Sequence, residues 1–249
     1  MIASMIFFPE KTLYEQPVDY GLAFEDVFLE TPDRVRLHGW FLPALREEKG
    51  VILFFHGNAG NISHRLYKVK RWVELGFSVF LLDYRGYGQS GGSISNENDV
   101  LTDARTAFEW LAGEKKKQLV KTILYGESLG THPVLRLAAE HRVAAVILEA
   151  PFTSFLDLAR RHYPLVPALL LKNFEFSNTE VISKVKSPVF IMHGTDDEIC
   201  PYAMGGELFE QTPNPKEFFT IAGGRHNDLP VHGGDDFWDK PFQFLSKYL

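Results

Sequence analysis

The chain has 249 residues, of which 45% are hydrophobic and 23% charged, a composition typical of a globular protein with a substantial core. Its formal net charge of -6 offers no basic surface for phosphate backbones, so we expect no nucleic-acid partner. The single cysteine, Cys200, excludes an intramolecular disulfide and a thiolate metal cluster.

The N-terminal stretch, residues 1–9, is apolar but far shorter than the roughly 20 residues that span a bilayer. It also lacks the basic residues with which a signal peptide begins. We therefore expect a cytoplasmic protein without a membrane span, which becomes membrane-associated if an anchor precedes residue 1.

Strand-like and helix-like patterns alternate along most of the chain. Residues 24–30 and 35–42 flank a turn-rich Thr-Pro-Asp-Arg sequence and predict an antiparallel pair of strands. The nearly continuous apolar runs that follow predict strands buried on both faces of a parallel sheet. These runs are residues 51–55, 77–82, 122–125, 145–148 and 189–192, and a last strand pattern follows at residues 217–221.

Helical patterns fill the gaps between these strands. Apolar side chains recur at helical spacing, and Gly76 and Gly113 stand where C-terminal caps belong. The helical segments are residues 62–75, 98–112 and 129–140. The alternation is that of βαβ units and predicts an α/β fold with a mostly parallel central sheet of about eight strands and helices on both faces.

A single domain is expected over residues 1–249, because no linker-like stretch interrupts the pattern. The strand rhythm stops between residues 153 and 186, where an apolar segment is broken by two prolines. This region predicts a small helical cap over the sheet. The alternative is an ordinary core-packing helix with an irregular start.

A Gly-x-Ser-x-Gly motif occupies residues 126–130. Chance alone supplies such a pentapeptide in roughly one chain in ten of this length. Here it directly follows one predicted strand and precedes a predicted helix, the setting that a nucleophile elbow requires. The glycines leave room for a tight turn, and Ser128 is the predicted nucleophile.

A serine hydroxyl needs a general base and a group that orients the base, and at a nucleophile elbow the chain order is serine, acid, histidine. His226 follows the last strand through the flexible residues 222–225 and is the predicted base. His232, further into the same loop, is the runner-up. His193 precedes the best acids and stands in the wrong order. Surface or packing positions are expected for His132, His141 and His162.

The acid is expected after the strand at residues 189–192, at the same sheet edge. Asp197 is preferred over Asp196. Glu149 ends the neighbouring strand but immediately precedes Ala-Pro, which disfavours it. Cys200 is disfavoured as a nucleophile, because the serine motif has far better local support.

The sequence His-Gly-Asn-Ala-Gly-Asn, residues 56–61, follows the first buried strand. Its glycines permit a backbone path that aims N–H groups at a substrate oxygen, and we assign the backbone amides of Asn58 and Leu129 to an oxyanion hole. No Gly-Lys-Ser/Thr follows the glycines, so this is not a phosphate-binding P-loop.

Together these residues resemble the α/β-hydrolase superfamily, and more closely its small-cap serine hydrolases, a group that includes bacterial esterases and eukaryotic protein depalmitoylases. The resemblance implies an acid at Asp197, a base at His226 and a structural loop at residues 83–90. Relatives often carry a small residue at His132, for which we expect a solvent-facing helix position. The matching segments are residues 7–9, 37–40, 56–61, 83–88, 125–130, 150–154, 193–197 and 224–228.

The predicted function is therefore cleavage of a small-molecule carboxylic ester or thioester through an acyl-enzyme, without a metal or cofactor. A small serine peptidase or amidase is the alternative enzyme, and a catalytically silent module that binds a ligand or partner is the alternative from another class. Haloalkane dehalogenases and epoxide hydrolases are excluded, because they need a carboxylate where Ser128 stands.

Overall fold

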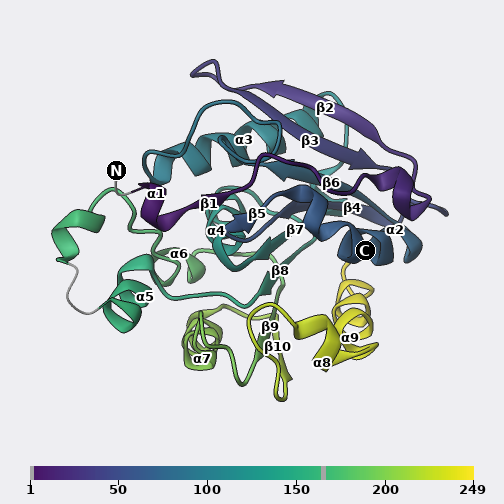
Figure 1. The fold of residues 1–249 in the computed structure, drawn as a ribbon. Helices are drawn as coiled ribbons and strands as arrows, with labels where there is room; N and C mark the ends of the chain where they lie inside the picture. Colours follow the sequence, from purple (N-terminus) through teal and green to yellow (C-terminus); the bar gives the residue numbers. More distant parts are fainter. Residues whose placement is uncertain (1–2, 164–166) are drawn as a thin grey trace.

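The computed structural model describes residues 3–163 and 167–249. An eight-stranded sheet in the order β10-β9-β8-β7-β4-β6-β3-β2 runs through its centre (Figure 1). β3 is antiparallel to both of its neighbours, β2 and β6, and the other adjacent pairs of strands in this sheet are parallel. The strands are β2 (Glu25–Glu30), β3 (Arg36–Leu42), β4 (Gly50–Phe55), β6 (Phe77–Asp83), β7 (Thr122–Glu127), β8 (Ala145–Glu149), β9 (Val189–Gly194) and β10 (Lys216–Ile221).

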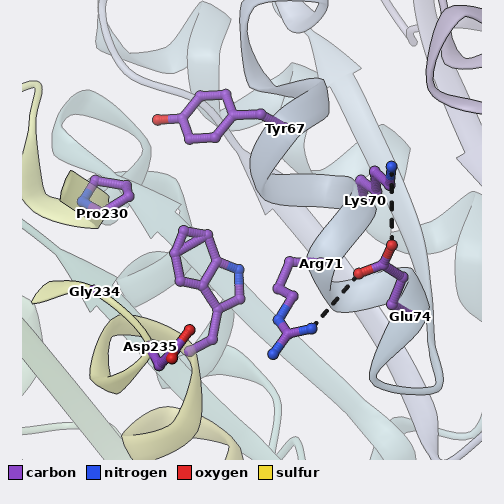
Figure 2. Close-up of a pocket in the computed structure, with 8 residues that line it drawn as sticks. Tyr67, Lys70, Arg71, Glu74, Pro230, Gly234 and Asp235 are labelled. Carbon is purple, nitrogen blue, oxygen red and sulfur yellow. Dashed lines mark ion pairs between the residues drawn. The ribbon is translucent and has the colours of Figure 1, made fainter.

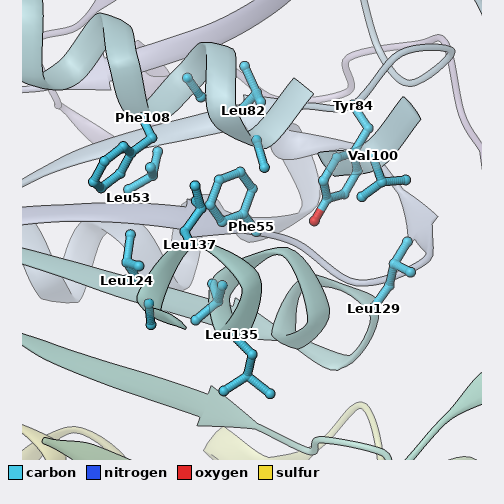
Figure 3. Close-up of a cluster of buried hydrophobic side chains, with 14 of the residues drawn as sticks. Leu53, Phe55, Leu82, Tyr84, Val100, Phe108, Leu124, Leu129, Leu135 and Leu137 are labelled. Atoms are coloured by element: carbon cyan, nitrogen blue, oxygen red, sulfur yellow. The ribbon is translucent and has the colours of Figure 1, made fainter. Parts of the chain in front are cut away.

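The central strands are buried on both faces, because successive side chains of a strand point to opposite sides of the sheet. In β4, Leu53 and Phe55 belong to one hydrophobic cluster, and Ile52 and Phe54 belong to the other. Figure 3 shows part of the first cluster, where Leu53, Phe55 and Leu82 meet side chains from two helices. The continuous apolar runs in the sequence follow from this double burial.

Helices cover both faces of the sheet. The first cluster includes side chains of α3 (Glu97–Gly113), α4 (Thr131–Glu140) and α7 (Tyr202–Gln211). The second includes side chains of α2 (Leu66–Glu74) and α9 (Asp236–Leu245). The prediction of a mostly parallel sheet between two helical layers is confirmed.

Some helix ends differ from the sequence prediction. The expected helix at 62–75 begins as a 3-10 turn, Ile62–Arg65 (η2), before α2. Gly76, just beyond α2, has a left-handed φ of 98°, as its predicted capping role requires. Gly113 is instead the last residue of α3, and Glu114 follows in a right-handed conformation. This helix therefore ends without a glycine cap.

Between β8 and β9 the chain leaves the sheet and forms short helices, which are α5 (Phe155–His162), η5 (Ala168–Leu171) and α6 (Thr179–Ile182). Residues 164–166 of the predicted cap lie outside the described residues. An aromatic cluster joins this region to the N-terminal segment, with the ring of Phe155 4.7 Å from Phe176 and that of Phe174 5.7 Å from Phe7. A capping role for residues 153–186 stays a prediction.

The remaining elements are short. They are α1 (Ala3–Ile6), β1 (Phe8–Pro9), η1 (Pro17–Tyr20), β5 (Ala59–Gly60), η3 (Leu119–Lys121), η4 (Ser128–Gly130) and α8 (Leu229–Gly233). β1 and β5 form a separate two-stranded parallel sheet. Within residues 3–163 and 167–249, no helix combines the length and the apolar character needed to cross a bilayer.

Candidate active site

Ser128 lies on a strained turn between β7 and α4. Its φ is 51°, in the left-handed region that non-glycine residues rarely adopt. The flanking glycines make this turn sterically possible: a Cβ on Gly126 would lie 2.5 Å from the Gly130 carbonyl oxygen, and one on Gly130 would lie 2.0 Å from that of Phe55. The turn directs Ser128 out of the carboxyl edge of the sheet.

Three side chains from three strand ends meet at this edge. The Nε2 atom of His226, in the loop after β10, lies 3.0 Å from the Ser128 Oγ. Its Nδ1 atom lies 2.8 Å from Oδ2 of Asp197, which follows β9. The structure thus brings the predicted nucleophile, base and acid into one hydrogen-bonded chain. With Nδ1 donating to the carboxylate, Nε2 is free to accept the serine proton.

The Asp197 carboxylate is fully buried, with 0% of its side chain exposed, and donors surround it. Its Oδ1 accepts hydrogen bonds from the backbone N–H groups of Ile199 at 2.9 Å and Cys200 at 2.7 Å. Burial by itself raises the pKa of this carboxyl, but hydrogen bonds from His193 and His226 outweigh it and hold the pKa well below its usual range. Asp197 therefore stays ionised beside His226.

The competing acids and bases lie elsewhere. Asp196 is exposed and bonded to Thr195, and His232 is exposed with its Nε2 3.4 Å from Asp228. Glu149 is buried and bonded to a lysine and a tyrosine. Cys200 is buried; burial raises the pKa of its thiol, and a hydrogen-bonding interaction with Ser128 only partly opposes that rise.

The loop predicted to supply the oxyanion hole lies against the elbow. A Cβ on Gly57 would be 3.5 Å from the Ser128 Cβ, so the loop backbone passes directly beside Ser128. Asn58 follows at the next position, and Leu129, buried at 1% exposure, directly follows Ser128. Tyr87 reaches this loop from residues 83–90, where its hydroxyl donates to the Asn58 carbonyl oxygen at 2.7 Å. This hydrogen bond explains how residues 83–90 can support the loop, in line with the structural role that the resemblance implies for them.

A buried cluster of charged residues, missed from the sequence, lies under the elbow. Arg65 and Lys68 donate to the two oxygens of Glu127, each at 2.8 Å, and Lys68 also donates to Glu149 at 2.6 Å. Burial raises the pKa of Glu127, but Arg65 and Lys68 hold that pKa well below its usual range. Glu127, between Gly126 and Ser128, was the available sequence signal for this cluster, because a buried carboxylate at so crowded a turn needs a cation nearby.

His132 corrects a prediction. It is fully buried rather than solvent-facing, because α4 turns this position toward residues 171–178. Its Nδ1 lies 2.9 Å from Asn178 Oδ1 and its Nε2 lies 2.9 Å from Glu97 Oε1.

His193, which stands in the wrong chain order for the base, contacts the loop of Asp197 instead. Its Nε2 donates to the Cys200 carbonyl oxygen at 2.7 Å and lies 3.3 Å from Asp197.

Two cavities lie away from the serine. One, of about 370 Å³, is flanked by Tyr67 and Trp238, with Arg71 and Glu74 forming an ion pair on its helical wall (Figure 2). The other, of about 980 Å³, lies between the N-terminal segment and residues 85–95. Ser128 is not among the described residues that line either one. The part of the chain that the structure describes contains no cluster of side chains arranged to hold a metal ion.

The chain is similar to hydrolases in sequence and in structure. Residues 46–182 match the family described as serine aminopeptidase, S33. The chain is 34% identical over 279 residues to the Arabidopsis thaliana alpha/beta hydrolase domain-containing protein WAV2, covering 99% of this chain and 90% of that protein. It is 33% identical over 230 residues to the Homo sapiens alpha/beta hydrolase domain-containing protein 17B, covering 91% of this chain and 77% of that protein.

Among solved structures, the Pyrococcus furiosus esterase Pf2001 superimposes with a TM-score of 0.78 at 18% identity, covering 98% of each chain. At this identity the likeness concerns the fold. The fold is therefore shared although most side chains differ, and the chemistry has to be argued from the side chains at the sheet edge.

Proposed function

The chain belongs to the α/β-hydrolase superfamily, and from that premise we propose that it is a serine hydrolase that cleaves carboxylic ester or thioester bonds through an acyl-enzyme. One observation carries the proposal. A serine with a φ of 51° is joined by hydrogen bonds of 3.0 and 2.8 Å to a histidine and then to a carboxylate. That arrangement activates a hydroxyl for attack on a carbonyl carbon.

In the proposed reaction, Ser128 Oγ attacks the carbonyl carbon while His226 Nε2 takes the serine proton. Asp197 holds the ring by its Nδ1–H and stabilises the imidazolium. The backbone N–H groups of Asn58 and Leu129 donate to the oxyanion of the tetrahedral intermediate. Collapse expels the alcohol or thiol, which receives the proton from His226. Water, deprotonated by the same nitrogen, then attacks the acyl carbon; its bond to Ser128 Oγ breaks, the proton returns to Oγ, and the carboxylic acid leaves.

The substitution Ser128→Ala tests the proposal. With p-nitrophenyl acetate and an acyl thioester as substrates, we expect kcat to fall by at least about 10³-fold. A fluorophosphonate probe should label the wild-type protein and leave the alanine variant unlabelled, whereas Cys200→Ala should still be labelled. Turnover that survives Ser128→Ala, or an unlabelled wild-type protein, would refute the assignment, and the unlabelled protein would favour the silent binding module.

An aminopeptidase is the second candidate, because the matching family is described by that activity. Such an enzyme needs a free carboxylate to bind the α-ammonium group of a peptide. Glu127, inside the elbow motif, is already bound by Arg65 and Lys68, and Glu149, at the end of the next strand, is bound by Lys68, which favours the ester reaction. Aminoacyl p-nitroanilides decide between the two: hydrolysis of these amides as fast as that of esters would establish the peptidase.

A further inference from the structure

An N-terminal segment, residues 6–12, runs along the oxyanion loop, residues 57–61, and we call it the N-terminal strap. Strand β1 of the strap pairs with β5 of the loop, with Phe8 opposite Ala59 and Pro9 opposite Gly60. The backbone N–H of Glu10 continues the pairing by donating to the Gly60 carbonyl oxygen at 3.1 Å. Figure 1 shows β1 and β5 side by side. The strap and loop are thus joined along their backbones.

Asn58 is held from two sides. Its side-chain Nδ2 donates to the carbonyl oxygen of Ile6, in the strap, at 2.6 Å. The Tyr87 hydroxyl lies 2.7 Å from its carbonyl oxygen and 3.1 Å from its Oδ1. Three polar groups of Asn58 are therefore fixed by the protein, and the fourth, the backbone N–H, is the one assigned to the oxyanion.

The far end of the loop is held in the same way. Asn61 is fully buried, and its Nδ2 donates to the carbonyl oxygens of Glu10 at 3.0 Å and Thr12 at 2.7 Å. Gly57 and Gly60 give the loop little rigidity of its own, since glycine restricts the backbone least. The conformation between β4 and α2 is consequently set from outside, largely by the strap.

Phe7 fastens the strap to the rest of the fold. Its side chain is 5% exposed, and its ring lies 5.7 Å from that of Phe174 and 6.2 Å from that of Phe176. The neighbouring Phe8 side chain points away from the core and is 57% exposed. One aromatic side chain therefore anchors the strap, while the next provides a matched control.

We propose that the N-terminal strap is a positioning element of the active site, which sets the Asn58 N–H for the oxyanion of the transition state. This inference rests on the proposed function. An oxyanion donor stabilises the transition state only within about 2.7–3.1 Å of the developing charge, and a displacement of about 1 Å costs up to roughly 100-fold in rate. A strap residue that never touches substrate therefore controls kcat.

The test compares Phe7→Ala with Phe7→Leu, which keeps an apolar anchor, and with Phe8→Ala, which keeps the strap backbone. Each variant is assayed for kcat and KM with a p-nitrophenyl ester and for inhibition by a trifluoromethyl ketone. The ketone carbon bonds to Ser128 Oγ, the serine proton passes to His226, and the resulting oxyanion enters the same hole. Because this adduct resembles the transition state, its Ki reports on oxyanion binding.

For Phe7→Ala we expect kcat to fall about 10-fold, KM to stay within about twofold, and Ki for the ketone to rise by the same factor as KM/kcat. Phe7→Leu should recover most of the loss, and Phe8→Ala should match the wild type. Asn58→Leu, which removes the bond to Ile6 without adding charge, should act in the same direction and serves if Phe7→Ala does not fold.

Equal kcat and Ki for Phe7→Ala and Phe8→Ala would overturn the inference, and so would a lower kcat with an unchanged Ki. Failure of the proposed function looks different. In that case Ser128→Ala retains turnover, and the ketone does not inhibit the wild-type protein. If the wild type depends on Ser128 while the strap variants remain normal, the strap inference alone fails.

Discussion

Replacing Lys68 by methionine removes the cation shared by two buried carboxylates under the nucleophile elbow. Lys68 Nζ lies 2.8 Å from Glu127 and 2.6 Å from Glu149, and the side-chain exposures of the three are 6%, 12% and 2%. Burial lowers the pKa of Lys68, but the two carboxylates raise it above its usual range, so this side chain is charged. Methionine fills similar space without charge.

The size of the effect follows from which carboxylate is left alone. Glu127 keeps its 2.8 Å bond to Arg65, whereas Glu149 keeps only the hydroxyl of Tyr125 as a donor among the bonds described for it. Breaking one buried ion pair from one side costs about 3–5 kcal/mol. For a chain of this length that loss corresponds to a Tm lower by roughly 6–20 °C.

Thermal and urea unfolding at pH 7 measure this loss, with Lys70→Met as the control. Lys70 lies on the same helix, is 43% exposed and pairs with Glu74 at 4.0 Å, so its loss should cost less than about 0.5 kcal/mol. Adding Glu149→Gln to Lys68→Met should restore much of the stability, because no unpaired carboxylate then remains buried. A Lys68→Met loss no larger than that of Lys70→Met would refute the reasoning.

Three further substitutions test other parts of the site. Glu97→Gln should lower the free energy of unfolding by about 2–3 kcal/mol at pH 7, as measured by urea titration. The pKa of the Glu97 carboxyl is about 2 in the folded protein against 4.5 unperturbed. The difference from wild type should therefore disappear as the pH falls from 4.5 toward 2. His193→Phe should move the acid limb of kcat/KM up by about 0.5–1 pH unit, because the Asp197 carboxylate loses the imidazole 3.3 Å from it and then binds protonated His226 more strongly, whereas the exposed His162→Phe should leave the limb in place. Gly130→Ala should abolish turnover and cost at least about 3 kcal/mol, since the added Cβ meets a strand carbonyl oxygen at 2.0 Å, while Gly113→Ala, with open space around it, should stabilise α3 by about 0.5–1 kcal/mol in thermal melts.

The features that the sequence predicts well are those that depend on residues close together in the chain. The strands follow from apolar runs, and the elbow follows from a motif placed between a strand and a helix. The hydrogen-bonded contact of Ser128, Asp197 and His226 could be predicted because parallel strands all end at one edge, so that loops far apart in the sequence meet there. These inferences need only the direction of each strand.

The features that the sequence misses depend on contacts between distant segments. From the sequence alone, His132 is predicted to face solvent, because Glu97 and Asn178, which cover it, come from elsewhere in the chain. The pairing of Lys68 with Glu127 joins residues 59 positions apart. Helical spacing gives the direction of a side chain on its own helix but not which partner covers that face.

Each of the proposed catalytic groups lies on a loop or turn that follows a different strand, so the sheet itself does not fix the positions of these groups. Lys68 and Arg65 hold the elbow, His193 holds the loop of the acid, and the N-terminal strap holds the oxyanion loop. Under the proposed mechanism these three supports act on different quantities, because the first neutralises buried charge, the second sets the electrostatic field at His226 and the third places the Asn58 N–H. Their loss should therefore appear separately, as lower stability, a shifted pH profile and weaker binding of a transition-state analogue. A single common effect from all three would mean that the site is held by the fold as a whole rather than loop by loop.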